Sequence, residues 1–140
     1  MRAAPTPYRS RVLKLDELCR RVVMVRAGAA EFTEGSRVSW RGRCERCGKV
    51  AWLQWAHFRS RAIHATRWDL DNSVALDAGC HFTWAHHRPD AFTEWMKRRL
   101  GDRRYRALAM RAGSGGRRPD PGLVELHLKA ELDALTGRTR

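Results

Sequence analysis

The sequence predicts an α+β fold in which a small ββα unit, held by metal-binding cysteine knuckles, is flanked by helices. The cysteine pair Cys44 and Cys47 leads into an apolar, tryptophan-rich stretch at 50–55 that is typical of a strand. A second short run at 72–76 predicts the partner strand, and the segment that begins at Cys80 favours a helix. A chain of 140 residues has room for one domain with a modest core and basic extensions.

The residues around the first predicted strand divide into an arm, a helix and loops. Residues 1–13 are polar and contain proline, so we expect a loose basic arm there. Apolar residues recur at helical spacing over 15–27, which predicts a helix, and Asp16 lies near its favourable N-terminal end. Residues 28–42 contain Gly and Ser without a sustained period and predict a loop or a loose hairpin. Residues 59–71 predict an irregular basic loop.

Three helices are predicted after the strands and the short helix that follows them. Pro89 begins the first of the three, and Gly101 is a plausible stop for it. The next begins near Asp102, whose side chain we expect to cap it. A linker rich in Gly, Pro and Arg follows at 113–121, and an amphipathic helix occupies 122–140.

The charge balance predicts a nucleic-acid partner. The chain has 28 Lys and Arg residues against 15 Asp and Glu residues, a formal net charge of +13 and a pI of about 11.1. Neutralising phosphates with such cations releases counterions, and arginine adds planar bidentate donors. The alternatives are the codon bias of a GC-rich genome and a generic RNA-coating protein. A basic run at 97–118 predicts a track for the DNA backbone, with a solvated charged face as the alternative.

The distribution of apolar residues predicts a cytoplasmic protein with no membrane partner. No apolar run approaches the length of a membrane span, and the N-terminus lacks the apolar core of a signal peptide. In a reducing compartment, the four cysteines are not expected to form structural disulfides. The spacing Cys44-x-x-Cys47 therefore favours a metal knuckle, whereas Cys19 lies on an apolar helical stripe and is expected in the core.

The cysteines predict a structural zinc site. Cys44, Cys47 and Cys80 supply three ligands, and Asp77, three residues before Cys80, is the candidate for the fourth. Closed zinc sites take four tetrahedral ligands, usually thiolate or imidazole, although carboxylate oxygen is allowed. The alternative role for Asp77 is to cap the following helix, with water, a nearby histidine or no group as the fourth ligand.

A second constellation combines three polar residues in the predicted ββα unit. His57 lies at the end of the first strand, Asn72 at the start of the second, and His81 in the helix. His81 directly follows Cys80, so its side chain points in a different direction from that of the zinc ligand. Because cysteine knuckles flank these three residues, we interpret them as one catalytic site rather than as three unrelated structural residues.

These residues resemble the HNH endonuclease superfamily, also called ββα-metal or His-Me finger, whose signature is His…Asn…His with optional zinc knuckles. The chain is similar in particular to small phage-encoded HNH proteins of the NinG recombination-protein group. The resemblance covers about residues 14–110, and we expect the nuclease domain over 14–112. The segments that carry the resemblance are CERCG, LQWAHFRSR, TRWDLDNSVAL, GCHFTW and RPDAFTEWMKRRLG.

The resemblance implies a role for each residue of the second constellation. His57 would be the general base that activates a water for attack on a phosphodiester phosphorus. Asn72 would hold the loop after His57 and orient the imidazole. His81 would be a ligand of a catalytic Mg²⁺ or Mn²⁺ ion, which stabilises charge on the phosphate and on the leaving oxygen. The products would carry 5′-phosphate and 3′-hydroxyl ends.

Two positions depart from the family pattern. Many HNH proteins have a metal-binding Asp or His just before the base, where this chain has Ala56. Others have a further histidine one helical turn past the position of His81, where this chain has Ala85. His86 is the candidate substitute. On a regular α-helix it lies about 140° round from His81, so it would join only where the helix ends or bulges.

We therefore expect a metal-dependent endonuclease that nicks or cleaves DNA with low sequence specificity. A phage or prophage origin is expected, with a homodimer or packaging and recombination proteins as candidate protein partners. One alternative is a branched-DNA (Holliday junction) resolvase. The other is a zinc-stabilised DNA-binding module whose catalytic site has decayed. The cations expected to contact DNA phosphates are Arg59, Arg61, Arg67, Lys97, Arg98, Arg103 and Arg104.

Overall fold

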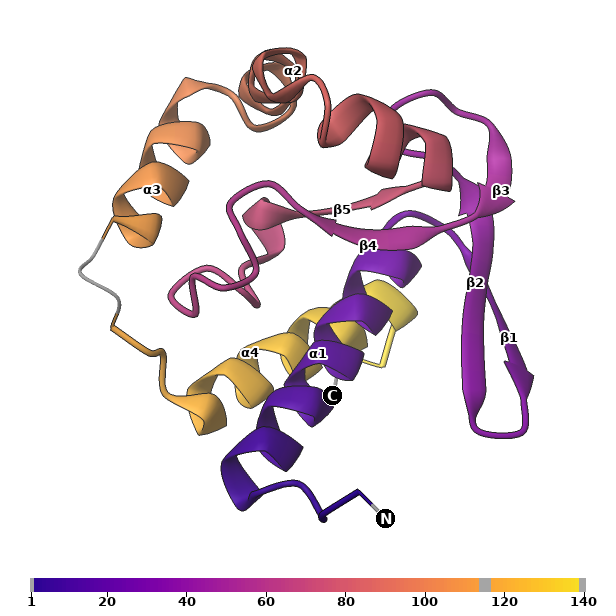
Figure 1. Ribbon diagram of the computed structural model, residues 1–140, viewed down its shortest axis with the longest axis vertical. Helices are drawn as coiled ribbons and strands as arrows, with labels where there is room; N and C mark the ends of the chain where they lie inside the picture. Colours follow the sequence, from indigo (N-terminus) through magenta and orange to yellow (C-terminus); the bar gives the residue numbers. More distant parts are fainter. Residues whose placement is uncertain (1, 114–116, 139–140) are drawn as a thin grey trace.

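An antiparallel hairpin lies at the centre of the computed structural model, which describes residues 2–113 and 117–138 (Figure 1). It consists of β4 (Gln54–His57) and β5 (Ser73–Leu76), in a register that pairs Gln54 with Leu76 and His57 with Ser73. Helices α2 and α3 lie along one side of this hairpin, and α1 and α4 lie along the other. The predicted α+β class is confirmed. The remaining elements are α1 (Pro7–Arg26), β1 (Ala30–Glu34), β2 (Arg37–Arg43), β3 (Val50–Trp52), η1 (Leu70–Asn72), η2 (Gly79–Ala85), α2 (Pro89–Leu100), α3 (Asp102–Ala112) and α4 (Pro121–Thr136).

The first helix begins earlier than the sequence predicted. We expected a loose arm over residues 1–13, but α1 starts at Pro7. Thr6 caps it, because its side chain accepts a hydrogen bond from the backbone N–H of Arg9, and proline is well suited to the first helical position. The prediction of an arm is therefore wrong from Pro7 onward. The C-terminal half of α1 is buried, with Val22, Val23 and Met24 fully inside the core.

The single strand predicted over 50–55 is two strands in two different sheets. β3 pairs with β2, whereas β4 pairs with β5. The chain passes from one sheet to the other at Leu53, whose side chain is buried and whose N–H donates to the carbonyl of Trp40. Periodicity alone cannot reveal this break, because the apolar run continues through it. The predicted loose hairpin over 28–42 is an antiparallel pair of strands, β1 and β2.

The predicted second strand and the helices after it lie close to their expected positions. β5 begins at Ser73, because Asn72 closes the short 3₁₀ turn η1. The helix near Cys80 is present as η2, but it is a π-helix. α2 ends at Leu100 before Gly101, as predicted. Asp102 does not cap α3; it is the first residue of the helix, and its carboxylate pairs with Arg106 at 2.9 Å.

Helix α4 packs against α1 (Figure 1). Leu128 of α4 is fully buried, and Glu125 bridges the two helices through a 2.9 Å contact with Lys14. Asp120 caps α4, and the helix begins at Pro121, one residue before the predicted start. The predicted linker at 113–121 and the predicted helix at 122–140 each include residues outside the described part of the chain. None of the described helices is long and apolar enough to cross a membrane.

Candidate functional site

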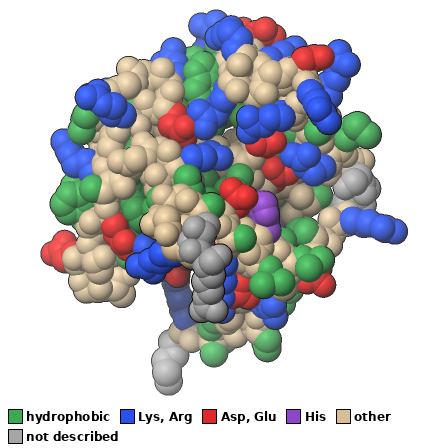
Figure 2. Space-filling model, turned by 180° about the vertical axis from the view of Figure 1, so that it is seen from behind, with side chains coloured by type: hydrophobic (Ala, Val, Ile, Leu, Met, Phe, Trp, Pro, Cys, Tyr) green, Lys and Arg blue, Asp and Glu red, His purple; other side chains and the backbone are tan. Residues whose placement is uncertain are grey.

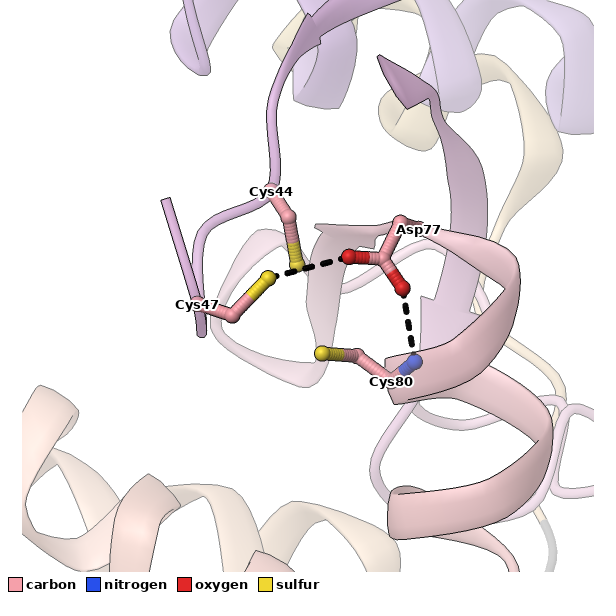
Figure 3. Close-up of side chains that lie close together, drawn as sticks. All are labelled: Cys44, Cys47, Asp77 and Cys80. Atoms are coloured by element: carbon pink, nitrogen blue, oxygen red, sulfur yellow. Dashed lines mark hydrogen bonds between the residues drawn. The ribbon is translucent and has the colours of Figure 1, made fainter. Parts of the chain in front are cut away.

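Three cysteines and one aspartate converge from two segments far apart in the sequence (Figure 3). Cys44 and Cys47 lie in the turn between β2 and β3, whereas Asp77 and Cys80 lie where β5 passes into η2. One ligand atom from each side chain, three sulfurs and a carboxylate oxygen, falls within 4.8 Å of all the others. Ligands in a tetrahedral zinc site are about 3.3–3.8 Å apart, given metal–ligand distances of about 2.0–2.3 Å. This group could hold a metal ion.

The two oxygens of Asp77 have different partners, as the dashed lines in Figure 3 show. Oδ1 accepts a 2.7 Å hydrogen bond from the backbone N–H of Cys80, which is the contact that a helix-capping aspartate makes. Oδ2 lies 3.0 Å from the sulfur of Cys47, which donates to it. The two roles considered for Asp77 from the sequence, metal ligand and helix cap, are therefore geometrically compatible.

The turn that contains Cys44 and Cys47 is attached to the central hairpin by Glu45. Its side chain accepts from the backbone N–H of Ala75 in β5, and it also pairs with Arg99 of α2 at 2.6 Å. Gly48, which ends the turn, has a φ of +76°, a conformation that disfavours a side chain. The Cys44–Cys47 turn is thus held to β5 and α2 by Glu45, independently of the cysteines.

Without an ion, the thiols of the group keep their protons and the carboxylate accepts hydrogen bonds. Burial raises the pKa of the Cys80 thiol to about 12, and the hydrogen bond to Asp77 raises the pKa of Cys47. The same hydrogen bond from Cys47, with that from the Cys80 backbone, lowers the pKa of Asp77 to about 2. A coordinated divalent ion deprotonates thiols outright. Arg46, whose guanidinium lies 3.6 Å from the Cys80 sulfur, supplies a positive charge beside the resulting anionic site.

The π-helix η2 brings His81 and His86 together. The hydrogen bonds of a π-helix run from residue i to i+5, so residues five apart lie on the same side, unlike in an α-helix. The ring centroids of His81 and His86 are 4.9 Å apart, in an edge-to-face arrangement. Sequence reasoning placed His86 about 140° away unless the helix bulged, and the π-helix is such a departure. Single π turns occur frequently at functional sites.

Gln54 of β4 orients the His81 ring. Its side-chain oxygen lies 2.7 Å from Nδ1 of His81, so Nδ1 carries the proton and Nε2 keeps its lone pair. Histidines that bind metals commonly donate their other ring N–H to an oxygen in this way. Burial, followed by the neighbouring His86, lowers the pKa of His81. Gln54 was not identified from the sequence, and nothing in its spacing would have revealed it.

His57 lies on a different part of the same hairpin. Its Nε2 donates a 2.9 Å hydrogen bond to the backbone carbonyl of Arg67, which leaves the lone pair on Nδ1. Burial lowers the pKa of His57 to about 4, so the ring is neutral at neutral pH. Among the described residues its only ring contact is with Trp55, and no hydrogen bond or ring contact joins it to His81 or His86.

Asn72 ties down the loop after His57. It is fully buried, and its side-chain oxygen accepts from the N–H of Arg59 at 2.6 Å. Its side-chain nitrogen donates to the carbonyls of Arg59 and Thr66. The resemblance to HNH proteins implied that this residue holds the loop after His57. These hydrogen bonds join the Asn72 side chain to the backbone of that loop.

Asp16 of α1 holds the other end of that loop. This buried carboxylate accepts hydrogen bonds from Arg67, at 2.6 and 2.9 Å, from Trp68 at 2.8 Å and from Arg61 at 3.1 Å. Burial alone would raise its pKa, but the hydrogen bonds from Arg67 and Trp68 outweigh burial and hold the pKa below its usual value. Asp16 thereby fixes Arg67, whose backbone carbonyl accepts the hydrogen bond that orients His57. The sequence offered one signal, an acid directly beside the apolar stripe of a helix.

Replacing Asp16 with Asn is expected to destabilise the fold by about 3–5 kcal/mol. The change removes the charge that compensates Arg67, whose side chain is only 12% exposed. Urea unfolding of Asp16→Asn would measure the loss. Glu17→Gln, one residue along on the exposed side of α1, is the matched control and should change the free energy of unfolding by less than about 0.5 kcal/mol. Equal losses in the two variants would contradict the role of Asp16.

The cations expected to contact DNA differ in their freedom to do so. Arg61 and Arg67 are bound to Asp16, and the guanidinium of Arg59 lies 5.2 Å from the Phe58 ring. Arg104 pairs with Asp71 at 2.5 Å, and Lys97 lies 3.4 Å from Glu94. Arg98 and Arg103 are exposed, with no salt bridge among the described residues. Lys and Arg side chains crowd the upper part of the face in Figure 2, over α2 and α3.

Comparisons with known proteins do not assign the chain to a family. No family model, curated protein or solved structure matches it. The arrangement of the residues therefore carries the functional argument.

Proposed function

We propose that the chain is a metal-dependent nuclease that hydrolyses phosphodiester bonds in DNA and that contains a structural zinc. The observation that carries this proposal is the meeting of His81 and His86 on one turn of a π-helix, with Gln54 orienting the His81 ring. His81 borders a groove of about 1000 Å³ that is also lined by Arg20, Arg37 and Arg61. Two neighbouring imidazoles, one of them lining an arginine-bearing groove, suit a divalent ion that meets a phosphate.

The structural zinc is proposed for Cys44, Cys47, Asp77 and Cys80. Three thiolates and a carboxylate form a donor set that zinc accepts, and their closed arrangement leaves no position for substrate. Cys80 and His81 are adjacent in the chain, so zinc bound to the first would hold the start of η2 and hence the position of the second. The zinc would act on catalysis only through this positioning.

In the proposed reaction, His57 accepts a proton at Nδ1 from the attacking water. The water oxygen bonds to phosphorus, the bond from phosphorus to the 3′ oxygen breaks, and the 3′ oxygen takes a proton from a solvent water, which leaves a 5′-phosphate and a 3′-hydroxyl. Nε2 of His57 stays bonded to the Arg67 carbonyl throughout, so the ring keeps its orientation. A divalent ion held by His81 and His86 would stabilise the negative charge that develops on the phosphate.

A zinc-stabilised nucleic-acid-binding module is the second candidate. One observation favours it: among the described residues, no hydrogen bond or ring contact joins His57 to His81 or His86. Ala56 and Ala85 also favour the binding module, because both stand where HNH proteins commonly have a metal-binding side chain. A branched-DNA resolvase remains an alternative within the nuclease class, and activity on a four-way junction compared with a linear duplex would test it.

Nicking of supercoiled plasmid with Mg²⁺ or Mn²⁺ distinguishes the two classes. Wild type is expected to convert the plasmid to open circles, and His81→Ala to lose at least about 100-fold in rate, because one of two ion-binding side chains is gone. His127→Ala, an exposed histidine on α4, is the matched control and should nick at the wild-type rate. If the protein retards DNA but does not nick it in the presence of any divalent ion tested, the nuclease is excluded and the binding module remains.

A further inference from the structure

The sheet of β1, β2 and β3 carries exposed aromatic and basic side chains on one face. Side chains alternate between the two faces of a strand, and directly paired residues share a face. The register pairs Phe32 with Ser39 and Arg41 with Trp52. Because Arg37, Ser39 and Arg41 alternate along β2, all of these side chains lie on the same face.

The two aromatic rings on this face are half exposed and touch each other. Phe32 is 50% exposed and Trp52 is 51% exposed, and their ring centroids lie 5.4 Å apart, edge to face. The guanidinium of Arg41 lies 5.4 Å from the Trp52 ring. On the opposite face of the sheet, Trp40 is only 5% exposed and lies under Arg21 of α1. The fold therefore buries one tryptophan of this sheet and leaves the other open.

This face continues into the groove that His81 borders, which we call the aromatic groove. Phe32 and Trp52 line one part of it, and Phe82, which is 51% exposed, lines it beside His81. Figure 1 shows the β1–β2 hairpin at the edge of the fold beside α1, where Arg21 of α1 pairs with Glu31 of β1 at 2.8 Å. A ligand lying in this groove would contact both the sheet and His81, because Phe32, Trp52 and His81 line the same groove.

The charge along the aromatic groove suits a phosphate backbone. Its charged lining consists of Arg20 and Arg37, with Arg61 paired to Asp16, against a single acid, Glu34. Within the described part of the chain, Arg20 and Arg37 form no salt bridge, so both are free to bind an anion. Aromatic faces with cations at their edges are the components of sites that bind single-stranded nucleic acids, where bases stack on rings and cations follow the backbone.

We propose that the aromatic groove binds single-stranded nucleic acid through stacking of unpaired bases on Trp52, Phe32 and Phe82. In a duplex the base faces are already stacked on one another, so a planar side chain has no free face to meet. A strand bound here would pass its backbone beside His81. That last step rests on the proposed nuclease function, whereas the binding does not.

Equilibrium binding to labelled oligothymidylate and to a duplex of matched length tests the proposal. Wild type should prefer the single strand, and Trp52→Ala should weaken single-strand binding about tenfold or more while changing duplex binding less than about twofold. Met110→Ala, which removes an exposed apolar side chain from α3, is the matched control and should alter neither affinity. Trp52→Phe keeps a ring at the site and should retain most of the affinity, which separates stacking from misfolding.

The outcomes separate this inference from the proposed function. Equal losses of single-strand and duplex binding in Trp52→Ala, or no loss of either, would overturn the inference, whether or not the protein nicks DNA. A Trp52-dependent preference for the single strand in a protein that nicks nothing would support the inference and end the nuclease proposal. If Trp52→Ala instead disrupts a dimer of the free protein and leaves single-strand binding intact, the face is a protein interface and the inference fails.

Discussion

Removal of zinc from the group of Cys44, Cys47, Asp77 and Cys80 is expected to unfold the chain. Structural zinc contributes about 10–16 kcal/mol of apparent binding free energy in small domains, whereas a typical domain is stable by only about 5–15 kcal/mol. The group ties the turn after β2 to the start of η2, two segments that are about 30 residues apart in the chain. Without the ion, three thiols and a carboxylate would crowd one partly buried site. Metal analysis should find one zinc per chain, and thermal unfolding followed by circular dichroism after chelation should lose its cooperative transition.

Substitution of one ligand separates the zinc from other effects of a chelator. Cys44→Ser should lower the zinc content well below one per chain and remove most of the stability. Cys19→Ala is the matched control, because Cys19 is a buried cysteine in α1 that lies outside the group. This control should keep its zinc and lose only the stability of a small core change. A metal-free protein that melts as cooperatively as the zinc-bound protein would rule out a structural ion.

Replacing His57 with Ala is expected to slow plasmid nicking by about 100-fold to 10,000-fold, the usual contribution of a positioned general base. The ring is neutral at working pH because burial lowers its pKa to about 4, and its Nδ1 lone pair is free because Nε2 donates to Arg67. The alanine variant has no proton acceptor at this position. Single-turnover rates with saturating protein would isolate this step from DNA binding.

Two further measurements identify the lost function as proton transfer. Added imidazole should restore part of the rate of His57→Ala, because it can occupy the space that the side chain leaves. His64→Ala is the matched control in the same loop. His64 contacts Tyr8 and Trp68 rather than the hairpin, so this variant should nick normally. Nicking by His57→Ala at the wild-type rate would exclude His57 as the base and leave His81 and His86 to be explained without it.

Much of the site follows from local sequence because its parts are short-range. The spacing of Cys44 and Cys47 forms a tight turn by itself, and Asp77 and Cys80 lie three residues apart at a helix start, where a carboxylate caps naturally. Their convergence needed only the antiparallel pairing of two strands. The cysteine group was therefore predicted in full, including the aspartate.

Other features depended on contacts between distant residues. Asp16 seemed to be an ordinary charge near a helix start, yet it receives hydrogen bonds from residues 45 to 52 positions away. Gln54 meets His81 only because η2 folds back over β4. The exposure of Trp52 also depends on which face of the β1–β2–β3 sheet is covered by α1.

The sequence by itself determined the α+β class, the order of most elements, and the four residues of the cysteine group. Those depend on periodicity, turn chemistry and ligand spacing, which act over a few residues. Only the tertiary structure decided that η2 is a π-helix and that His86 lies beside His81. It also decided that Arg61 and Arg67 bind Asp16 instead of standing free for phosphate. The physical reason is the same in each case: the geometry of a helix turn and the partner of a buried charge are selected by packing against distant elements, which no local pattern records.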